Sequence, residues 1–257
     1  MISAPTEQTK KTNPNLTIHP SPATIPKGGT DPMKPKDVRR LSDPFFQARG
    51  FTRRGNLYCK IGSSVACCVL FEPAGLLYCT YCVIPLYMPS EDLYLTYGTR
   101  VETFTRYRLP PLDMSQSDET CAAWVRSLTD LLDRRILPFF ARIDTPEHLA
   151  RFLKRGYRWV KRYFFCTKEQ YCYLRAYTAF ALGDDRRAEA SIRASLRELD
   201  CTSPYPYTES YKAMRRKEFD SIRDLLGVSP ADRNHYLQSI ISETRSHLFP
   251  DTESIVQ

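Results

Sequence analysis

Long apolar runs are missing from this chain of 257 residues, and that lack argues against a membrane protein. A membrane-spanning helix needs about 20 predominantly apolar residues. The longest apolar stretch, Leu76 to Leu86, contains Thr80 and reaches Pro85 near its end. The N-terminal segment is polar and rich in proline, without the apolar centre of a signal peptide. We therefore expect a cytoplasmic protein that makes no contact with a membrane.

Glycine and histidine are scarce, and several enzyme classes lose support for that reason. The ten glycines form neither the GxGxxG fingerprint of dinucleotide binding nor the GxxxxGK[ST] loop that holds phosphates. The four histidines form no HExxH zinc motif, and the chain has no GxSxG nucleophile elbow. The sequence therefore predicts no cofactor, no metal ion and no identifiable catalytic residue. An enzyme whose cysteines and histidines meet only in space remains an open alternative.

Cysteine is plentiful by contrast, with nine residues, and an odd number leaves at least one thiol outside any intrachain disulfide. Five of the nine fall within 24 residues that we expect to form strands: Cys59, Cys67, Cys68, Cys79 and Cys82. Side chains alternate between the two faces of a strand, so Cys79 and Cys82 point to opposite faces. A tetrahedral zinc site needs converging ligands. We therefore interpret these cysteines as buried core residues.

Composition divides the chain into three parts. Residues 1–33 carry six of the 19 prolines with few large apolar side chains, and we expect a disordered tail. Residues 34–160 are expected to form an α+β domain, and residues 161–257 a helical C-terminal region.

Strands are predicted where apolar residues alternate between glycine- and proline-rich turns. The expected strands are 56–61, 65–71, 76–86 and 94–104, and their short connections favour an antiparallel sheet of about four strands. Flanking helices are predicted at 35–48, where Pro44 should kink or end the helix, at 118–140, and from Thr145 to about Gly156. Beyond them we expect helices at 167–182, 185–199 and 209–226, and one that starts at Pro230.

Charge is uneven along the chain, which carries a net charge of +8. Residues 61–120 hold three basic and seven acidic residues, whereas residues 121–170 hold eleven basic and five acidic ones. The densest basic run is Arg151, Lys154, Arg155, Arg158, Lys161 and Arg162, with Tyr157, Trp159 and Tyr163 between its members. These cations could bind an acidic protein surface or a nucleic acid, or form an ordinary solvated helix face. The first four share one helical face only if the helix continues past Gly156.

Two segments resemble known families. The small and aromatic residues of 167–199, among them Tyr173, Ala176 and Gly183, resemble one tetratricopeptide-type helical hairpin, although no second copy follows. Residues 45–153 resemble an uncharacterised bacterial family of α+β domains of unknown function. That likeness is carried by the motif from Phe46 to Tyr58, by 65–71, and by Ile136-Leu137-Pro138-Phe139-Phe140 with Thr145-Pro146-Glu147-His148-Leu149. The family implies an α+β fold and no catalytic residues.

The functional prediction is a non-enzymatic cytoplasmic interaction protein of the immunity or adaptor kind. It would bind an acidic protein surface through the basic run from Arg151 to Arg162. The alternatives are a nucleic-acid-binding module that uses the same residues, and an enzyme with a dispersed Cys/His site.

Overall fold

The structure, a computed structural model, describes residues 35–90, 95–104, 109–201 and 207–250. The tail predicted for residues 1–33 lies outside the described residues. Among the described residues, five antiparallel strands form one sheet in the order β1-β2-β3-β4-β5. The strands are β1 (Thr52–Arg54), β2 (Leu57–Ile61), β3 (Val65–Ala74), β4 (Leu76–Pro85) and β5 (Gly98–Arg100). The α+β class with an antiparallel sheet is therefore confirmed, with the short edge strand β1 added.

The strand predicted for 94–104 is wrong over most of its length. Within the described residues, a 3-10 turn η1 (Leu95–Tyr97) precedes β5, and a short helix α2 (Val101–Phe104) follows it. Pairing with β4 requires a very close approach, because a Cβ on Gly98 would lie 1.8 Å from the Tyr81 carbonyl oxygen. Further along, the Glu102 carboxylate accepts the Cys79 backbone N–H at 3.2 Å, which replaces a ladder hydrogen bond. The pairing therefore ends after three residues.

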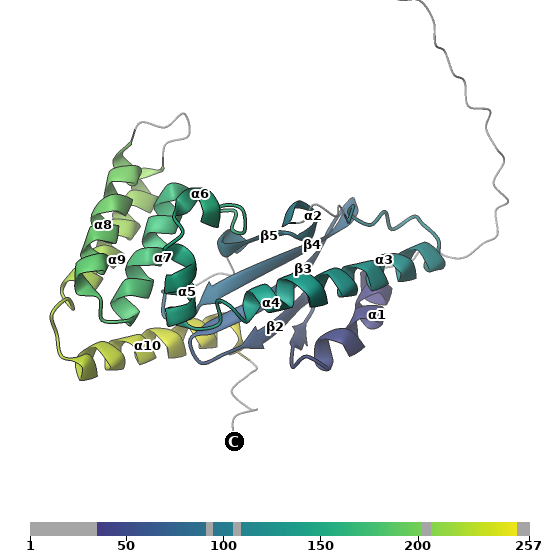
Figure 1. Cartoon of the computed structure of the whole chain (residues 1–257), viewed down its shortest axis with the longest axis horizontal. Coiled ribbons are helices and arrows are strands. Elements are labelled where there is room, and N and C mark those ends of the chain that lie inside the picture. Colours follow the sequence, from purple (N-terminus) through teal and green to yellow (C-terminus); the bar gives the residue numbers. More distant parts are fainter. Residues whose placement is uncertain (1–34, 91–94, 105–108, 202–206, 251–257) are drawn as a thin grey trace, which may run out of the picture. The chain divides into compact units, whose positions relative to one another are not determined.

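One face of the sheet is aromatic and is covered by the helices that flank it in the sequence. The helix α1 (Pro35–Gln47) supplies Phe46, whose ring stacks on Tyr58 of β2 with centroids 3.9 Å apart. Tyr81 of β4 meets the rings of Phe139 and Phe140 from α4 (Leu137–Phe140). Figure 1 shows α3 (Asp118–Leu131) and α4 crossing in front of the strands. These rings are large apolar surfaces removed from water, and they dominate this part of the core.

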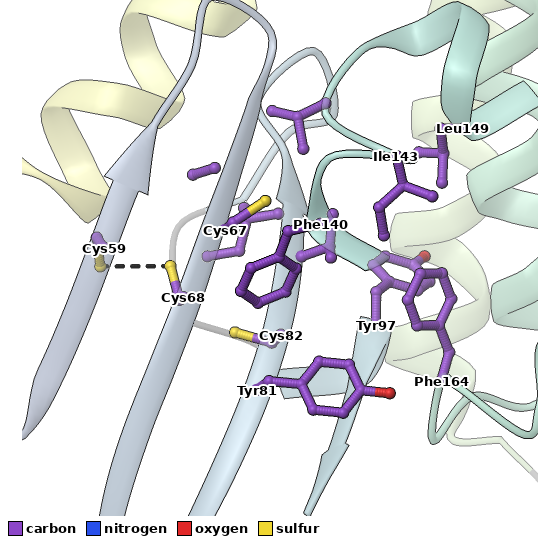
Figure 2. Packing of buried hydrophobic residues seen from close by; sticks show 14 of the residues in the cluster. Cys59, Cys67, Cys68, Tyr81, Cys82, Tyr97, Phe140, Ile143, Leu149 and Phe164 are labelled. Carbon is purple, nitrogen blue, oxygen red and sulfur yellow. Dashed lines mark hydrogen bonds between the residues drawn. The ribbon is translucent and has the colours of Figure 1, made fainter. Parts of the chain in front are cut away.

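The cysteines behave as buried core residues, as the alternation predicts. Seven of the nine are buried, Cys166 is half-buried and Cys201 is exposed. Cys59, Cys68 and Cys82 are register partners on three adjacent strands, and the Cys68 thiol donates to Cys59 Sγ at 3.3 Å. Figure 2 shows Cys67 on the Phe140 side of the sheet, while Cys68 faces Cys59. No group of three or more potential ligands able to hold a metal occurs in the part of the chain that was described.

Two predicted helices differ in detail from the expectation. The predicted helix 118–140 comprises α3 (Asp118–Leu131), a π-helical segment η2 (Leu132–Ile136) and α4, so one wide turn interrupts it. Pro138 falls in the first turn of α4, where a missing N–H costs little. In α1, Pro44 lies inside the helix and does not end it, because the chain continues in helical form to Gln47.

Six further helices follow in the described C-terminal half of the chain. They are α5 (Pro146–Leu153), α6 (Tyr157–Val160), α7 (Lys168–Ala181), α8 (Asp185–Asp200), α9 (Glu209–Arg223) and α10 (Pro230–Leu248). Local signals set their starts, as the sequence indicates. Thr167 and Gln170 form a capping box on α7, and the side chains of Asp184 and Ser229 cap α8 and α10. The predicted hairpin of α7 and α8 is present, with Gly183 at its turn in the left-handed region, φ 72°.

The sheet and the helical region share contacts across the boundary predicted at residue 160. Tyr87 after β4 hydrogen-bonds to Thr178 of α7 at 3.0 Å, and Tyr97 donates to the Gln170 carbonyl at 3.2 Å. Thr244 of α10 donates to the Met88 carbonyl at 3.1 Å. All of the described residues belong to one compact unit.

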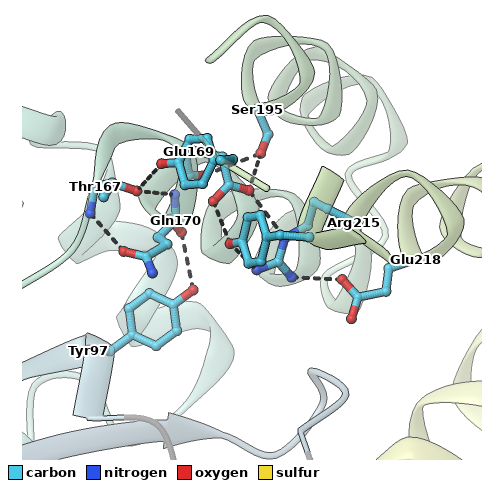
Figure 3. A network of polar contacts seen from close by, with 9 residues as sticks. Tyr97, Thr167, Glu169, Gln170, Ser195, Arg215 and Glu218 are labelled. Carbon is cyan, nitrogen blue, oxygen red and sulfur yellow. Dashed lines mark hydrogen bonds and ion pairs between the residues drawn. The ribbon is translucent and has the colours of Figure 1, made fainter. Parts of the chain in front are cut away.

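A buried polar network joins α7, α8 and α9 (Figure 3). The Glu169 carboxylate of α7 has no exposed side-chain surface, and it accepts hydrogen bonds from Ser195 at 2.9 Å and Tyr211 at 3.0 Å. Arg215 of α9 lies 3.2 Å from the same carboxylate, stacks over the Tyr173 ring at 3.4 Å and pairs with Glu218 at 2.7 Å. Burial is the largest cause of the raised pKa of Glu169, opposed by Arg215, Ser195 and Tyr211. The three helices are thus aligned by specific polar contacts as well as by apolar packing.

Candidate functional site

The six predicted cations lie on two consecutive helical turns rather than on one helix. Arg151 is in α5, Lys154 and Arg155 follow its end, and Arg158 is in α6, with Lys161 and Arg162 just beyond it. We call Arg151, Lys154, Arg155, Arg158, Lys161 and Arg162 the basic surface. The chain breaks direction at Gly156, whose φ of 86° lies in the left-handed region and is incompatible with a continuous helix. A single helical face from Arg151 to Arg158 is therefore not formed.

Arg151, Lys154 and Arg155 of the basic surface still lie on one side of a helical turn. Thr145 caps α5 by accepting the His148 N–H at 3.2 Å, and Pro146 occupies the first turn. Helical hydrogen bonding extends past Leu153, since Lys154 N–H donates to the Ala150 carbonyl at 3.1 Å. Residues spaced three and four apart are neighbours on a helix, so Arg151 adjoins both Lys154 and Arg155.

The aromatic residues between the cations fix this segment to the body of the protein. Tyr163 stacks on Phe139 with centroids 5.1 Å apart, and its backbone carbonyl accepts the Tyr81 hydroxyl at 2.7 Å. Trp159 packs against Phe152 at 5.0 Å, and the Arg155 guanidinium lies 4.2 Å from the Trp159 ring centroid. The aromatic side chains thus pack inward while the cations between them face water.

The basic surface lacks carboxylate partners within the described residues. All six side chains belong to exposed residues, and none lies within ion-pair distance of a described Asp or Glu. Some exposed arginines in the same half of the chain are paired, such as Arg134 with Asp130 at 2.7 Å, whereas Arg135 and Arg142 are exposed and also have no described ion-pair partner. Like charges three or four apart on a helix destabilise it by about 0.2–0.5 kcal/mol per pair. Among the described residues, no carboxylate at ion-pair distance offsets the charge of the basic surface.

Phe165 is the residue of this region that the sequence pattern does not single out. Its side chain is 85% exposed, whereas the adjacent Phe164 is 1% exposed. The Phe165 backbone N–H donates to the Gly98 carbonyl of β5 at 2.6 Å, and this long-range bond sets which of the two rings faces water. In an extended segment, neighbouring side chains point to opposite sides, so the sequence could indicate that one of the two phenylalanines is exposed. It does not tell which one.

The cysteines show no sign of nucleophilic activation. Burial raises the pKa of the Cys67 and Cys79 thiols, raises that of Cys166 to about 12 and raises that of Cys172 to about 11. Reactive cysteines have a lowered pKa and partial exposure. In the described part of the chain no cysteine hydrogen-bonds to a histidine, and His148 instead pairs with Asp144 at 2.7 Å.

A second polar cluster joins β3, β4 and β5. Glu72 accepts a short hydrogen bond from Thr80 and lies 3.7 Å from Arg100, whose guanidinium covers the Tyr78 ring at 3.8 Å. Burial is the largest cause of the raised pKa of Glu102 nearby. Glu72 and Arg100 thus have partners within this cluster.

Comparisons with known proteins identify no relative of this chain. A scan against models of protein families, a search of curated proteins and a search of solved structures each find no match. In the described residues, no helix combines the length and the apolar character that crossing a membrane requires.

Proposed function

We propose that this chain is a non-enzymatic, cytoplasmic protein-interaction module of the immunity or adaptor kind, which binds an acidic surface of a partner protein. The observation that carries the proposal is the basic surface: six exposed cations without a described carboxylate partner, on a segment fixed by aromatic packing. Fixed charges of one sign steer an oppositely charged partner and select against others.

A protein partner fits better than a nucleic acid. Single-stranded nucleic acids are held by several aromatic platforms. Phe165 is the one aromatic among the large hydrophobic side chains found exposed in the described residues.

The test is a capture experiment with a charge-matched control. The full chain is immobilised and exposed to a lysate of the organism that makes it. The retained protein is identified by mass spectrometry, purified and titrated by calorimetry against three chains. One is unaltered, one carries Arg151→Glu, Lys154→Glu and Arg155→Glu, and one carries Arg126→Glu, Arg135→Glu and Lys217→Glu. The control residues are also exposed cations outside the basic surface, so both variants change the net charge equally.

We expect the basic-surface variant to lose at least about tenfold in affinity for an acidic partner, while the control stays within about twofold. Equal effects of the two variants would reject the basic surface as the binding site. Retention of material that ribonuclease or deoxyribonuclease releases, with affinity falling steeply as salt rises, would replace the proposal by the nucleic-acid alternative.

A further inference from the structure

Phe165 is far more exposed than any other large apolar side chain of the described residues. Its ring is 85% exposed, compared with 47% for Met214, 41% for Leu41 and 36% for Leu182. Single exposed apolar residues are common on protein surfaces and need no explanation by themselves. Phe165 differs from them in how firmly it is held and in what surrounds it.

The backbone of Phe165 is fixed on both sides. Its own N–H donates to the Gly98 carbonyl at 2.6 Å, and the preceding Phe164 is buried in the aromatic cluster with Phe152, at a centroid distance of 5.2 Å. On the other side, the Cys166 carbonyl accepts the Tyr157 hydroxyl at 3.3 Å. The ring therefore projects from an ordered backbone, and a partner that binds it does not have to order the segment first.

Phe165 lies close to the basic surface along the chain, three residues after Arg162. The Tyr157 ring that contacts Cys166 also has the Lys161 ammonium 5.7 Å from its centroid. The half-buried rings of Trp159 and Tyr163 lie 4.6 Å apart, and the Arg155 guanidinium lies over the Trp159 ring at 4.2 Å. Residues 151–165 thus carry an exposed aromatic residue and six cations on one short stretch of chain, and protein interfaces are enriched in aromatic residues and arginine.

We infer that the partner presents an acidic segment with large apolar side chains, and that these cover Phe165 while its carboxylates meet the basic surface. This inference rests on the proposed function and adds the apolar half of the recognition. A partner recognised by charge alone would leave the ring of Phe165 in water, and truncating that ring would not affect its binding. A partner that buries the ring gains apolar contact at the anchor, where truncation of an aromatic residue costs more than about tenfold in affinity.

Two fluorescein-labelled peptides of equal length and equal negative charge test the inference. One contains only glutamate and serine, and in the other leucine replaces serine. Oligouridine of the same charge serves as a third probe. Binding to the full chain is followed by fluorescence anisotropy, with Phe165→Ala as the test variant and Met214→Ala as the control for loss of an exposed apolar side chain.

We expect the glutamate–leucine peptide to bind at least about tenfold more tightly than the glutamate–serine peptide, and Phe165→Ala to abolish that difference. Met214→Ala should leave it unchanged. Equal affinity for the two peptides, both lost on charge reversal at Arg151, Lys154 and Arg155, would overturn the inference and leave the proposed function intact. Binding of oligouridine alone, or of no probe, would overturn both.

Discussion

Replacing Glu169 by alanine should lower the free energy of unfolding by about 3 kcal/mol, because its carboxylate is the centre of the buried network that joins α7, α8 and α9. The side chain of Glu169 has no exposed surface, and that of Arg215 is only 10% exposed. Removing one partner of a buried ion pair is costly because the remaining polar groups have no water to bind instead.

The magnitude follows from the contacts that are lost. Ser195 and Tyr211 donate to the carboxylate at 2.9 and 3.0 Å, and hydrogen bonds to a charged group contribute about 1.5–3 kcal/mol each. Such terms within one network are not additive. Arg215 keeps Glu218 at 2.7 Å, so its charge remains partly compensated. These considerations place the loss near the lower end of the range of about 3–5 kcal/mol for a broken buried pair.

Urea denaturation followed by circular dichroism measures this loss, and the pair of Arg216 with Asp200 provides the control. That pair also connects α8 and α9, at 2.7 Å, but its side chains are 45% and 57% exposed. Asp200→Ala should cost less than about 1 kcal/mol. If Glu169→Ala is no more costly than Asp200→Ala, the network does not hold the three helices together as argued.

Three further predictions concern the sheet and the thiols. Gly98→Ala should lower the free energy of unfolding, measured by urea denaturation, by about 3 kcal/mol, because the new Cβ would lie 1.8 Å from the Tyr81 carbonyl oxygen. The control Gly75→Ala has no atom within 4 Å of its Cβ but a φ of 74°, and it should cost about 1 kcal/mol. Equal losses for the two variants would contradict the steric cause. At pH 7 a maleimide should label Cys201 rapidly in the folded protein and the buried thiols only after denaturation, and a second fast thiol would revive the Cys/His enzyme alternative. Because the pKa of Glu102 is raised in the folded protein, its contribution to stability is complete below its ordinary pKa of 4.5 and is lost as pH rises through the raised value. The stability of the wild type relative to Glu102→Gln should therefore fall as pH rises above 4.5, and parallel pH profiles of the two proteins would refute this.

Local signals account for the parts of the fold that the sequence predicts correctly. Helix caps such as Thr167 with Gln170 act within four residues, and hairpins such as the one joining β3 to β4 act between neighbours in the chain. The missed strand β1 is only Thr-Arg-Arg, without apolar alternation, and it forms because β2 offers a partner. The shortened β5 depends on how closely Gly98 approaches β4, which no local pattern reveals.

The candidate site likewise has some features that the sequence predicts and others that depend on contacts between distant residues. The exposure of the six cations follows from polar residues alternating with aromatic ones. Gly156 is compatible with either a helix that continues or one that stops, and its φ of 86° decides for the stop. Which phenylalanine faces water depends on the bond from Phe165 to Gly98, a contact between residues far apart in the sequence. The anchor of the proposed interface is therefore a tertiary feature.

Selection for stability alone does not explain the basic surface. Repulsion between Arg151 and its neighbours Lys154 and Arg155 costs about 0.2–0.5 kcal/mol per pair. A glutamate in place of one of them would give attraction at the same spacing. The stacking of Arg155 on Trp159, at 4.2 Å, recovers a comparable amount of about 0.5–1 kcal/mol for that one residue. Lys154 has no such contact among the described residues. The proposed interface accounts for cations that contribute little to the stability of the free protein and that lie on a backbone held by the aromatic cluster.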